Sequence, residues 1–580
     1  MMKAPLALLL LCGCFTATPA QLPLTSPDAS TAPDYRSRTI YFLMTDRFHP
    51  HQPYAPYVDP QYPDATNPLN CFTQSCTTDP EFRKYWGGDL QGVIEKLDYL
   101  RDLGVSAVWL TPLMENVRAY EGGDAYGTGY HGYWIQNYYR VNEHFGSWDD
   151  VNQLSRALHQ NGMRYIQDIT LNHSNPNNNH VNGALFESEV ADNPFINSYD
   201  DDYDPANGMR YYKHYQGDAR CQAPILPAAD YNWSYWQLHH CLLADLSGYN
   251  QHDPAMANYL LGAGKTWIDN GVDDYRLDAV KFPFPDFIAT FTRTMRNYLA
   301  SLHRPSPYIV GEWSHGGVGD AKSLRFANNY QLFGTNILDF QLSFALNQFI
   351  GGDHEDPTQK ITAFDLDNFL HERTLAFNGR DDWQGTFLDN HDQIRTMVRL
   401  QKLGITNETE RQQRMDLASV LLMTVRGIPI IYYGDEQYLA YYNDLHNTPP
   451  EYVNSDDDDP YNRPGLNKFD EETPAFKTIS TLARLRKNNP AVSQGKYITA
   501  YVDNDLLMFE RVYNGKIVLV AVNRGDEKTL SVPGRLGLAP GYYTGLLQHA
   551  SEVNDGNYLS VVPGAWTLHI NKLSSLVLRP

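Results

Sequence analysis

Short hydrophobic runs alternate with longer amphipathic stretches through most of the chain. The short runs are rich in β-branched and aromatic residues and predict buried strands. The expected strands are Thr39–Met44, Ala107–Thr111, Tyr165–Thr170, Asp274–Leu277, Tyr308–Gly311, Ile337–Phe340, Gly385–Leu388 and Pro429–Tyr432. Helical patterns between them include Leu90–Leu103, Trp148–Gln160, Ala255–Asn270 and Arg411–Thr424. Strands that alternate with helices in this way predict an α/β protein, a (β/α)8 TIM barrel, although periodicity alone leaves an open doubly wound sheet as the alternative.

Two stretches depart from this alternation. Residues 173–245, after the third expected strand, are rich in Asn, Asp, Tyr and Pro and lack a clear helical pattern, which predicts an inserted subdomain. Beyond the helical pattern Ala475–Lys487, the segments Leu506–Arg511 and Ile517–Asn523 predict strands joined by the turn Asn514-Gly515. We therefore expect a barrel formed by residues 36–172 and 246–492, followed by a C-terminal antiparallel β-sandwich over residues 493–580.

The N-terminus has the organisation of an export signal. Lys3 precedes the apolar run Ala4–Cys14, and the small residues Thr18-Pro19-Ala20 follow it. Because this run is too short to span a membrane, residues 1–20 predict a signal peptide and a secreted, periplasmic or cell-surface protein. The segment Leu11-Cys12-Gly13-Cys14 also resembles a bacterial lipoprotein box, so a lipid anchor at Cys14 stays open as an alternative.

Composition and charge restrict the partners of the chain. The 580 residues are 42% hydrophobic and 20% charged, as in ordinary globular proteins. A formal net charge of −22 would repel nucleic acid and anionic membranes, so we expect neither as a partner. The 13% of aromatic residues suit sugar binding, and core packing explains them equally well. We expect a monomer.

Four cysteines lie beyond the export signal, at Cys71, Cys76, Cys221 and Cys241. An even number in an exported chain predicts two disulfides, and we expect the local pairs Cys71–Cys76 and Cys221–Cys241. The alternative is a zinc site, which no His–Cys spacing in the sequence supports.

Polar residues gather where four of the expected strands end. Because the carboxyl ends of barrel strands meet on one face, these side chains are expected to lie together. An acid at one strand end is often only a helix cap, but four such segments favour a catalytic site. The segments are Asp168 to His173, Arg276 to Lys281, Gly311 to Trp313 and Asp389 to Asp392.

These segments resemble the signature regions of glycoside hydrolase family 13, the α-amylase family. The resemblance extends from Thr45-Asp46-Arg47-Phe48 to the C-terminal domain. Within the family, the chain is most similar to the cyclodextrin glucanotransferases. The similarity rests on Tyr130-His131-Gly132-Tyr133-Trp134, Leu243-Ala244-Asp245-Leu246 and Arg426-Gly427-Ile428-Pro429. It implies an α-glucan substrate such as starch, glycogen or a maltooligosaccharide.

A retaining glycosidase needs two carboxyl groups about 5 Å apart. The resemblance makes Asp278 the nucleophile and Glu312 the general acid/base, with Asp392 as the third acid of the family. Arg276 is expected to keep Asp278 ionised, and Asp168 to orient its neighbours. The other residues expected to bind the glucan are His173, His391, Tyr133, His131, Lys281, Asp459 and Arg463.

The resemblance also implies a calcium ion (Ca²⁺) between the barrel and the insertion. Asn172 and Asp245 are the expected ligands, with a backbone carbonyl near Phe282 as a further candidate. The second calcium site of the glucanotransferases is not expected. Asp89 is present, but His49-Pro50-His51-Gln52 stands where that site has its Asp and Asn.

Three positions depart from the glucanotransferase pattern. Cys241 stands where the cyclising enzymes carry an aromatic ring, Ser314 replaces an aromatic residue two positions after the general acid, and Phe282 replaces a histidine. We also expect no starch-binding domain. The first two departures remove apolar surface from the acceptor side, so water should compete better for the glycosyl-enzyme. They predict an α-amylase.

Other functions stay open at this point. The nearest alternative is a cyclodextrin glucanotransferase or a linear 4-α-glucanotransferase. Further alternatives are an enzyme for sucrose or trehalose, and a binding protein that has lost activity. The presence of all three acids, Asp278, Glu312 and Asp392, argues against the last.

Overall fold

The computed structural model describes most of the chain, from residue 34 to residue 579. The described residues are 34–58, 60, 68–74, 76, 78–117, 127–176, 206–209, 211–213, 219, 221, 235–243, 246–314, 321–351, 361–440, 460–546 and 556–579. The predicted signal peptide, Cys14, Asp245 and Asp459 lie outside these residues. Within the part described, no helix is both long and apolar enough to cross a membrane.

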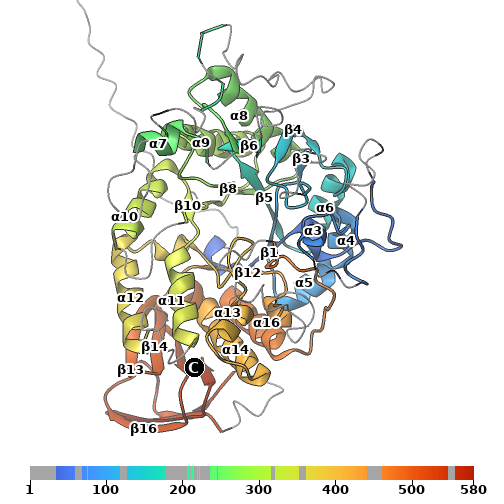
Figure 1. The fold of residues 1–580 in the computed structure, drawn as a ribbon. Helices are drawn as coiled ribbons and strands as arrows, with labels where there is room; N and C mark the ends of the chain where they lie inside the picture. Colours follow the sequence, from blue (N-terminus) through green and yellow to red (C-terminus); the bar gives the residue numbers. More distant parts are fainter. Residues whose placement is uncertain are drawn as a thin grey trace, which may run out of the picture.

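Eight parallel strands form the centre of the molecule (Figure 1). They are β1 (Ile40–Leu43), β2 (Ala107–Leu110), β5 (Arg164–Thr170), β8 (Asp274–Asp278), β9 (Ile309–Gly311), β10 (Asn336–Ile337), β11 (Gly385–Thr386) and β12 (Ile428–Tyr432). Their order in the sheet is β10-β9-β8-β5-β2-β1-β12-β11. A parallel bridge between Leu338 and Gly385 joins the two edge strands. The predicted (β/α)8 barrel is confirmed.

The helices of the described residues include those that connect successive strands and cover the outside of the barrel (Figure 1). They are α1 (Thr45–Phe48), α3 (Asp79–Phe82), α4 (Leu90–Glu95), α5 (Leu97–Leu103), α6 (Trp148–Gln160), α7 (Tyr235–His240), α8 (Pro254–Asp269), α9 (Pro285–Ser301), α10 (Ala321–Asn329), α11 (Phe340–Ile350), α12 (Ala363–Ala376), α13 (Thr396–Lys402), α14 (Glu408–Thr424), α16 (Pro474–Asn488) and α17 (Pro490–Gln494).

Local sequence explains where these helices begin. Ser147 and Asp150 form a capping box before α6, and the helix buries Val151, Leu154 and Leu158 on one face. Asp253 caps α8 by accepting from the Met256 N–H, and Pro254 occupies the first turn.

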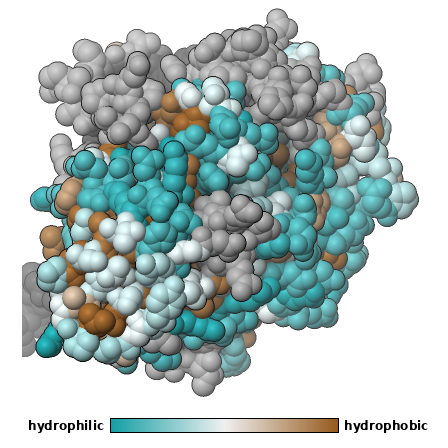
Figure 2. All heavy atoms as spheres, turned by 90° about the horizontal axis from the view of Figure 1, so that it is seen from below, coloured by the Kyte–Doolittle hydropathy of each residue, from teal (hydrophilic) through white to brown (hydrophobic). Residues whose placement is uncertain are grey.

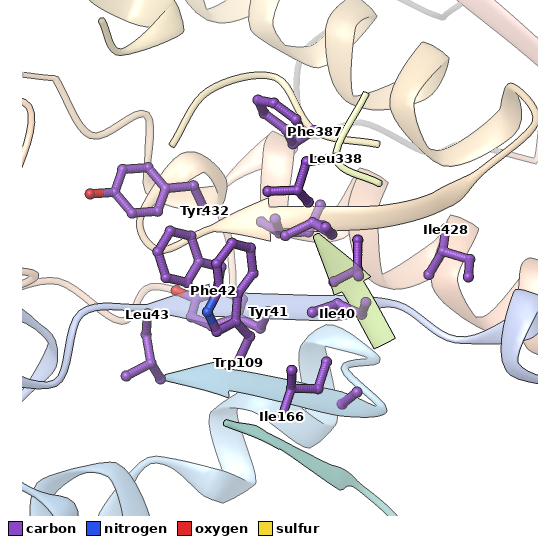
Figure 3. Packing of buried hydrophobic residues seen from close by; sticks show 14 of the residues in the cluster. Ile40, Tyr41, Phe42, Leu43, Trp109, Ile166, Leu338, Phe387, Ile428 and Tyr432 are labelled. Atoms are coloured by element: carbon purple, nitrogen blue, oxygen red, sulfur yellow. The ribbon is translucent and has the colours of Figure 1, made fainter. Parts of the chain in front are cut away.

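Side chains from neighbouring strands fill the barrel core, as Figure 3 shows for residues around Phe42. Phe42 is fully buried and stacks on Trp109, with ring centroids 3.8 Å apart, and on Tyr432, at 5.2 Å. These rings come from β1, β2 and β12. They form a stacked layer in the barrel core.

The insertion after β5 contributes two short strands and a helix to the described residues. Strand β6 (His173–Pro176) pairs with β7 (Leu246–Gly248), and β3 (Met114–Asn116) pairs with β4 (Ile135–Val141) after β2. The sequence shows no clear helical pattern in this insertion, and the structure places the six-residue helix α7 within it. Both predicted disulfides, Cys71–Cys76 and Cys221–Cys241, are present.

Two antiparallel sheets form the C-terminal sandwich, at the bottom of Figure 1. Their strands are β13 (Lys496–Val502), β14 (Leu506–Tyr513), β15 (Lys516–Asn523) and β20 (Ser574–Leu578) in one sheet, and β16 (Lys528–Pro533), β17 (Gly541–Thr544), β18 (Tyr558–Val562) and β19 (Ala565–Ile570) in the other. The predicted Asn514-Gly515 turn joins β14 and β15, with both residues at positive φ, 47° and 79°.

The molecular face seen in Figure 2 is mostly hydrophilic. Hydrophobic side chains appear there in small separate groups, a pattern typical of a surface in contact with water.

Candidate active site

Asp278 and Glu312 lie at the carboxyl ends of neighbouring strands, and Arg276 holds both. Asp278 is the last residue of β8, and Glu312 follows β9. Arg276 Nη1 donates to Asp278 Oδ1 at 2.8 Å, and its Nη2 donates to Glu312 Oε2 at 2.6 Å. One guanidinium therefore binds the two carboxyl groups from adjacent nitrogens, which fixes them close together and facing the same space.

A third carboxylate also binds the guanidinium. Arg276 Nη1 donates to both oxygens of Asp168 at 2.9 Å. Asp168 Oδ2 also accepts from Trp109 Nε1 at 3.0 Å and from the Tyr133 hydroxyl at 2.9 Å. Asp168 thus orients Arg276 and Tyr133 at once, which is the arrangement that the sequence predicts.

Burial shapes the ionisation of these acids. Removal from water raises the pKa of Asp278 well above the ordinary carboxyl value, while the Arg276 guanidinium opposes the shift and Glu312 adds to it. Burial likewise raises the pKa of Asp168 to about 6, again against the effect of Arg276. Closely spaced carboxyl groups disfavour double ionisation, which suits chemistry that begins with one of them protonated.

The turn after β8 also contacts Glu312. Ala279 has φ of 44°, a left-handed conformation that non-glycine residues rarely adopt. Its N–H donates to Glu312 Oε2 at 3.1 Å. Because both bonds to Glu312 end on Oε2, the Oε1 atom is the one placed to carry and donate a proton.

Asp392 enters the site from the loop after β11. Arg463 Nη2 donates to Asp392 Oδ1 at 3.1 Å, and His391 Nε2 lies 3.2 Å from Asp392 Oδ2. Arg463 Nε also donates to the His391 carbonyl at 2.9 Å and Nη1 to the Tyr130 hydroxyl at 3.1 Å. Arg463 was predicted to bind sugar with Asp459. In the structure it holds the Asp392 loop, and Asp459 lies outside the described residues.

Three histidines predicted at the site lie around the carboxyl groups. His173 Nε2 is 3.9 Å from Asp278 Oδ2. His391 stacks on Tyr133 with ring centroids 4.9 Å apart, and His131 Nδ1 accepts from the Tyr133 backbone N–H at 3.0 Å. Burial lowers the pKa of His173 to about 3 and those of His131 and His391 well below the usual value. All three are therefore neutral at pH 7 and can bind hydroxyl groups.

Lys281 lies beside the end of β9. Its Nζ donates to the Ser314 carbonyl at 2.8 Å, so the side chain joins the ends of β8 and β9. Burial lowers the pKa of Lys281, and Glu312 opposes that shift. At the position where cyclising enzymes carry an aromatic ring, Cys241 is buried and bonded to Cys221.

The residues expected to bind calcium contact a lysine. Lys213 Nζ donates to Asn172 Oδ1 at 2.6 Å and to the Phe282 carbonyl at 2.8 Å. Burial lowers the pKa of Lys213 to about 7. Both oxygens assigned to the ion thus accept hydrogen bonds from one amine, and the described residues at this position do not fit a calcium ion. Asp245, the other expected ligand, lies outside the described residues.

Asp89 also has a nitrogen partner, because its Oδ2 is bonded to His51 Nδ1. Among the described residues, no group of three or more His, Cys, Asp and Glu side chains is arranged to hold a metal ion.

Several residues at the site were missed in the sequence. Lys213, Tyr130, Trp109 and Asn462 all bond to predicted site residues or to their loops. Tyr130 and Trp109 belong to segments recognised for other reasons, whereas Lys213 lies in the insertion, where neither periodicity nor motif marks it.

Comparison with known proteins gives the same picture as the geometry. A family model described as "Alpha amylase, catalytic domain" matches residues 45–464. The chain is 35% identical over 568 residues to a cyclomaltodextrin glucanotransferase of Klebsiella oxytoca, covering 94% of this chain and 78% of the relative. It is 31% identical to that of Bacillus sp. (strain 1-1), covering 92% of this chain and 66% of the relative.

Solved structures include similar proteins of both activities. The cyclomaltodextrin glucanotransferase CldA, which has a three-domain ABC distribution, is 28% identical with a TM-score of 0.70, covering 93% of this chain and 99% of that one. An Anoxybacillus α-amylase is 25% identical with a TM-score of 0.68, covering 95% and 99%. Domain content therefore does not separate the two activities.

Proposed function

Because the chain belongs to the α-amylase family, glycoside hydrolase family 13, we propose that it is a secreted α-amylase. In this proposal it cleaves internal α-1,4-glucosidic bonds of starch-like glucans with retention of configuration and yields maltooligosaccharides. The observation that carries the proposal is the Arg276 guanidinium bonded to both Asp278 and Glu312. Such a pair is compatible with the separation of roughly 5 Å that retaining chemistry requires.

The first chemical step forms a covalent intermediate. Glu312 donates its proton to the glycosidic oxygen, whose bond to the anomeric carbon breaks, and the Asp278 carboxylate attacks that carbon. The aglycone leaves as an alcohol, and the glucosyl unit stays bonded to Asp278 as an ester. Asp392 and the neutral His173 and His391 bind sugar hydroxyls, while Tyr133 offers its ring face to the sugar at the cleavage point.

The second step releases the product. Glu312, now a carboxylate, takes a proton from water, and the resulting hydroxide attacks the anomeric carbon. The ester bond to Asp278 breaks, and the second inversion restores the starting configuration. In both steps Arg276 stabilises whichever carboxyl group carries the negative charge.

Hydrolysis rather than transfer is favoured by the acceptor side. Cys241 is buried in a disulfide and offers no ring around which a glucan can wrap, and Ser314 lacks an apolar surface for an acceptor sugar. Water then has less competition for the glycosyl-enzyme.

The second candidate is a cyclodextrin or linear 4-α-glucanotransferase. It is favoured by the identity of 35% to the Klebsiella oxytoca cyclomaltodextrin glucanotransferase. A substitution at Ser314 that restores an aromatic ring separates these candidates at the level of one residue.

Stereochemistry tests the mechanism directly. Proton NMR of maltooligosaccharide cleavage, recorded before mutarotation, should show the α-anomer as the first product. A β-anomer would place a water molecule between the carboxyl groups and would contradict the roles given to Asp278 and Glu312.

Export remains part of the proposal. The apolar run Ala4–Cys14 and the small residues that follow support secretion, and lipidation at Cys14 would instead keep the enzyme on the cell surface. A starch-degrading enzyme needs access to a polymer that does not enter cells.

A further inference from the structure

Lys213 crosses from the insertion to the barrel and ends at the position expected for a calcium ion. The residue is buried, with 3% of its surface exposed. Its Nζ donates to Asn172 Oδ1, at the end of β5, and to the Phe282 carbonyl, in the loop after β8. The amine therefore links three segments that are far apart in the sequence.

A calcium ion at this position would collide with the amine. Calcium binds oxygen ligands at roughly 2.3–2.6 Å. Lys213 Nζ lies 2.6 Å from Asn172 Oδ1 and 2.8 Å from the Phe282 oxygen, so an ion shared by those oxygens would overlap the nitrogen. The two cannot occupy the site together.

The backbone around Lys213 fixes it in place. The Lys213 N–H donates to the Gly248 carbonyl at 2.8 Å, and the Asn250 N–H donates to the Tyr211 carbonyl at 2.7 Å. Gly248 leaves room for the lysine, because a Cβ there would lie 2.9 Å from Lys213 Cδ. The Tyr249 N–H also binds the Asn172 carbonyl at 2.7 Å.

Asn172 connects Lys213 to the active site. With Oδ1 turned toward Lys213, the Asn172 amide nitrogen faces His173 Nδ1 at 3.2 Å. The amide donates, so His173 Nδ1 accepts and its proton lies on Nε2, the atom nearest the nucleophile. A calcium ion bound to Asn172 Oδ1 would orient the amide in the same way.

We propose that the side-chain nitrogen of Lys213 replaces the calcium ion at the joint between the insertion and the barrel, and that this joint forms without metal. The proposal concerns stability and metal dependence, and it stands whichever glucan reaction the enzyme catalyses.

Thermal unfolding of the wild-type protein, in chelator and in excess calcium, is the first test. We expect the same midpoint in both conditions. A calcium-dependent rise that Asn172→Ala abolishes would overturn the proposal. A rise that persists in Asn172→Ala would come from calcium bound elsewhere and would agree with it.

The second test removes the amine. Lys213→Ser removes the nitrogen but keeps both oxygens, and exposed Lys487 on α16 offers the matched control Lys487→Ser. In chelator we expect the midpoint of Lys213→Ser to fall by about 3 °C or more, with no change in the control. Calcium should raise the midpoint of Lys213→Ser and leave wild type and control unchanged.

Either of two results would contradict the proposal: an unchanged midpoint of Lys213→Ser in chelator, or a lowered one that calcium does not raise. If Lys213→Ser does not fold, Gly248→Ala serves as a milder variant, since its new methyl group displaces the lysine stem. We expect a lowered midpoint for Gly248→Ala in chelator, and a wild-type midpoint would count against the proposal.

Discussion

Arg276 binds three carboxyl groups of the site. Its guanidinium contacts Asp168, Asp278 and Glu312, each within 2.9 Å. No neutral side chain offers donors in this forked geometry, and lysine would place a single charge where two directed bonds are needed. The assignment of distinct roles to Asp278 and Glu312 can be tested by changing the acid alone.

Glu312→Gln should lower the rate of starch cleavage by about 10²- to 10⁴-fold, because the glycosidic oxygen loses its proton donor. Maltosyl fluoride releases its fluoride without protonation. On this substrate, the rate of the step that forms the intermediate should fall much less. Pre-steady-state release of fluoride measures this difference. Equal losses on both substrates would show that Glu312 is not the acid.

In the proposed function, Ser314 favours water over sugar acceptors because it offers no aromatic surface. Ser314→Tyr restores an aromatic surface there, and we expect the ratio of transfer to hydrolysis on maltooligosaccharides to rise severalfold. Ser314→Ala, which adds no ring, is the matched control. Chromatography with a labelled maltose acceptor gives the ratio, and an unchanged ratio in Ser314→Tyr would remove the main argument for hydrolysis.

The sequence predicts the acids because each lies in a recognisable motif at a strand end. It could not identify Lys213, because the position of that residue depends on a bridge between Tyr212 and Tyr249 that forms only in the folded chain. The bonds from Lys213 to two of the oxygens expected to bind calcium could not be predicted for the same reason. Asn172 matches the family motif, but no pattern in the sequence marks Lys213 as its hydrogen-bond partner.

At the scale of elements, the amino ends of the barrel strands carry ion pairs with a structural role. Asp273 precedes β8 and accepts from the Tyr165 N–H at 3.0 Å. His159 Nε2 of α6 lies 2.7 Å from it, and Arg304 Nη2 donates to it at 2.9 Å. Burial would raise the pKa of Asp273, but the His159 contact and Arg164 outweigh it and lower the pKa to about 2.

The lowered pKa of Asp273 predicts how the stability of the fold depends on pH. Its carboxylate stabilises the folded state above the unfolded pKa of about 4, and the contribution is lost as pH falls toward 2. We expect Asp273→Asn to lower the free energy of unfolding by roughly 2 kcal/mol at pH 6 and by clearly less at pH 3. Denaturant titrations at both pH values measure it. An equal loss at both, or a pH-dependent loss in the exposed control Asp149→Asn, would contradict the assignment.

Element boundaries show what hydrophobic patterns miss. The run Ile337–Phe340 predicts one strand, but β10 ends at Ile337 because Asp339 caps α11 by accepting from the Leu342 N–H. Helix α7 was missed because it has only six residues and carries two histidines among its apolar positions. Both cases depend on local capping or tertiary packing, which periodicity does not record.

At the scale of the whole molecule, the C-terminal sheet belongs to two cores. Leu507 and Phe509 of β14 pack into the barrel core, whereas Leu506 and Met508 face the second sheet of the sandwich. The alternation follows from the two-residue period of a strand. Arg524 adds polar contacts, because its Nη1 donates to the Phe349 carbonyl at 2.5 Å and to the Ile361 carbonyl at 2.7 Å.

This shared core predicts that the barrel and the sandwich unfold together. Phe509→Ala should lower the free energy of unfolding by about 3–5 kcal/mol. It should also lower the temperature of the single calorimetric transition of the entire protein. Met508→Ala, on the opposite face, is the matched control and should lower the same transition. Two separate transitions, each sensitive to only one variant, would show independent domains.

The sequence predicted this sandwich from one hairpin, but it could not show which face of the sheet meets the barrel. Both faces of β14 are hydrophobic, so the alternation that normally marks a solvent-exposed face is missing. Only the fold distinguishes the two.

The proposed hydrolysis of α-glucans by Asp278 and Glu312 is tested most directly by the products formed from soluble starch. Chromatography and a reducing-end assay, with Asp278→Asn in parallel, should show short linear maltooligosaccharides and rising reducing ends with wild type and neither with the variant. Cyclic glucans, or longer linear chains without new reducing ends, would contradict hydrolysis and favour the glucanotransferase. Equal activity in Asp278→Asn would contradict the mechanism itself.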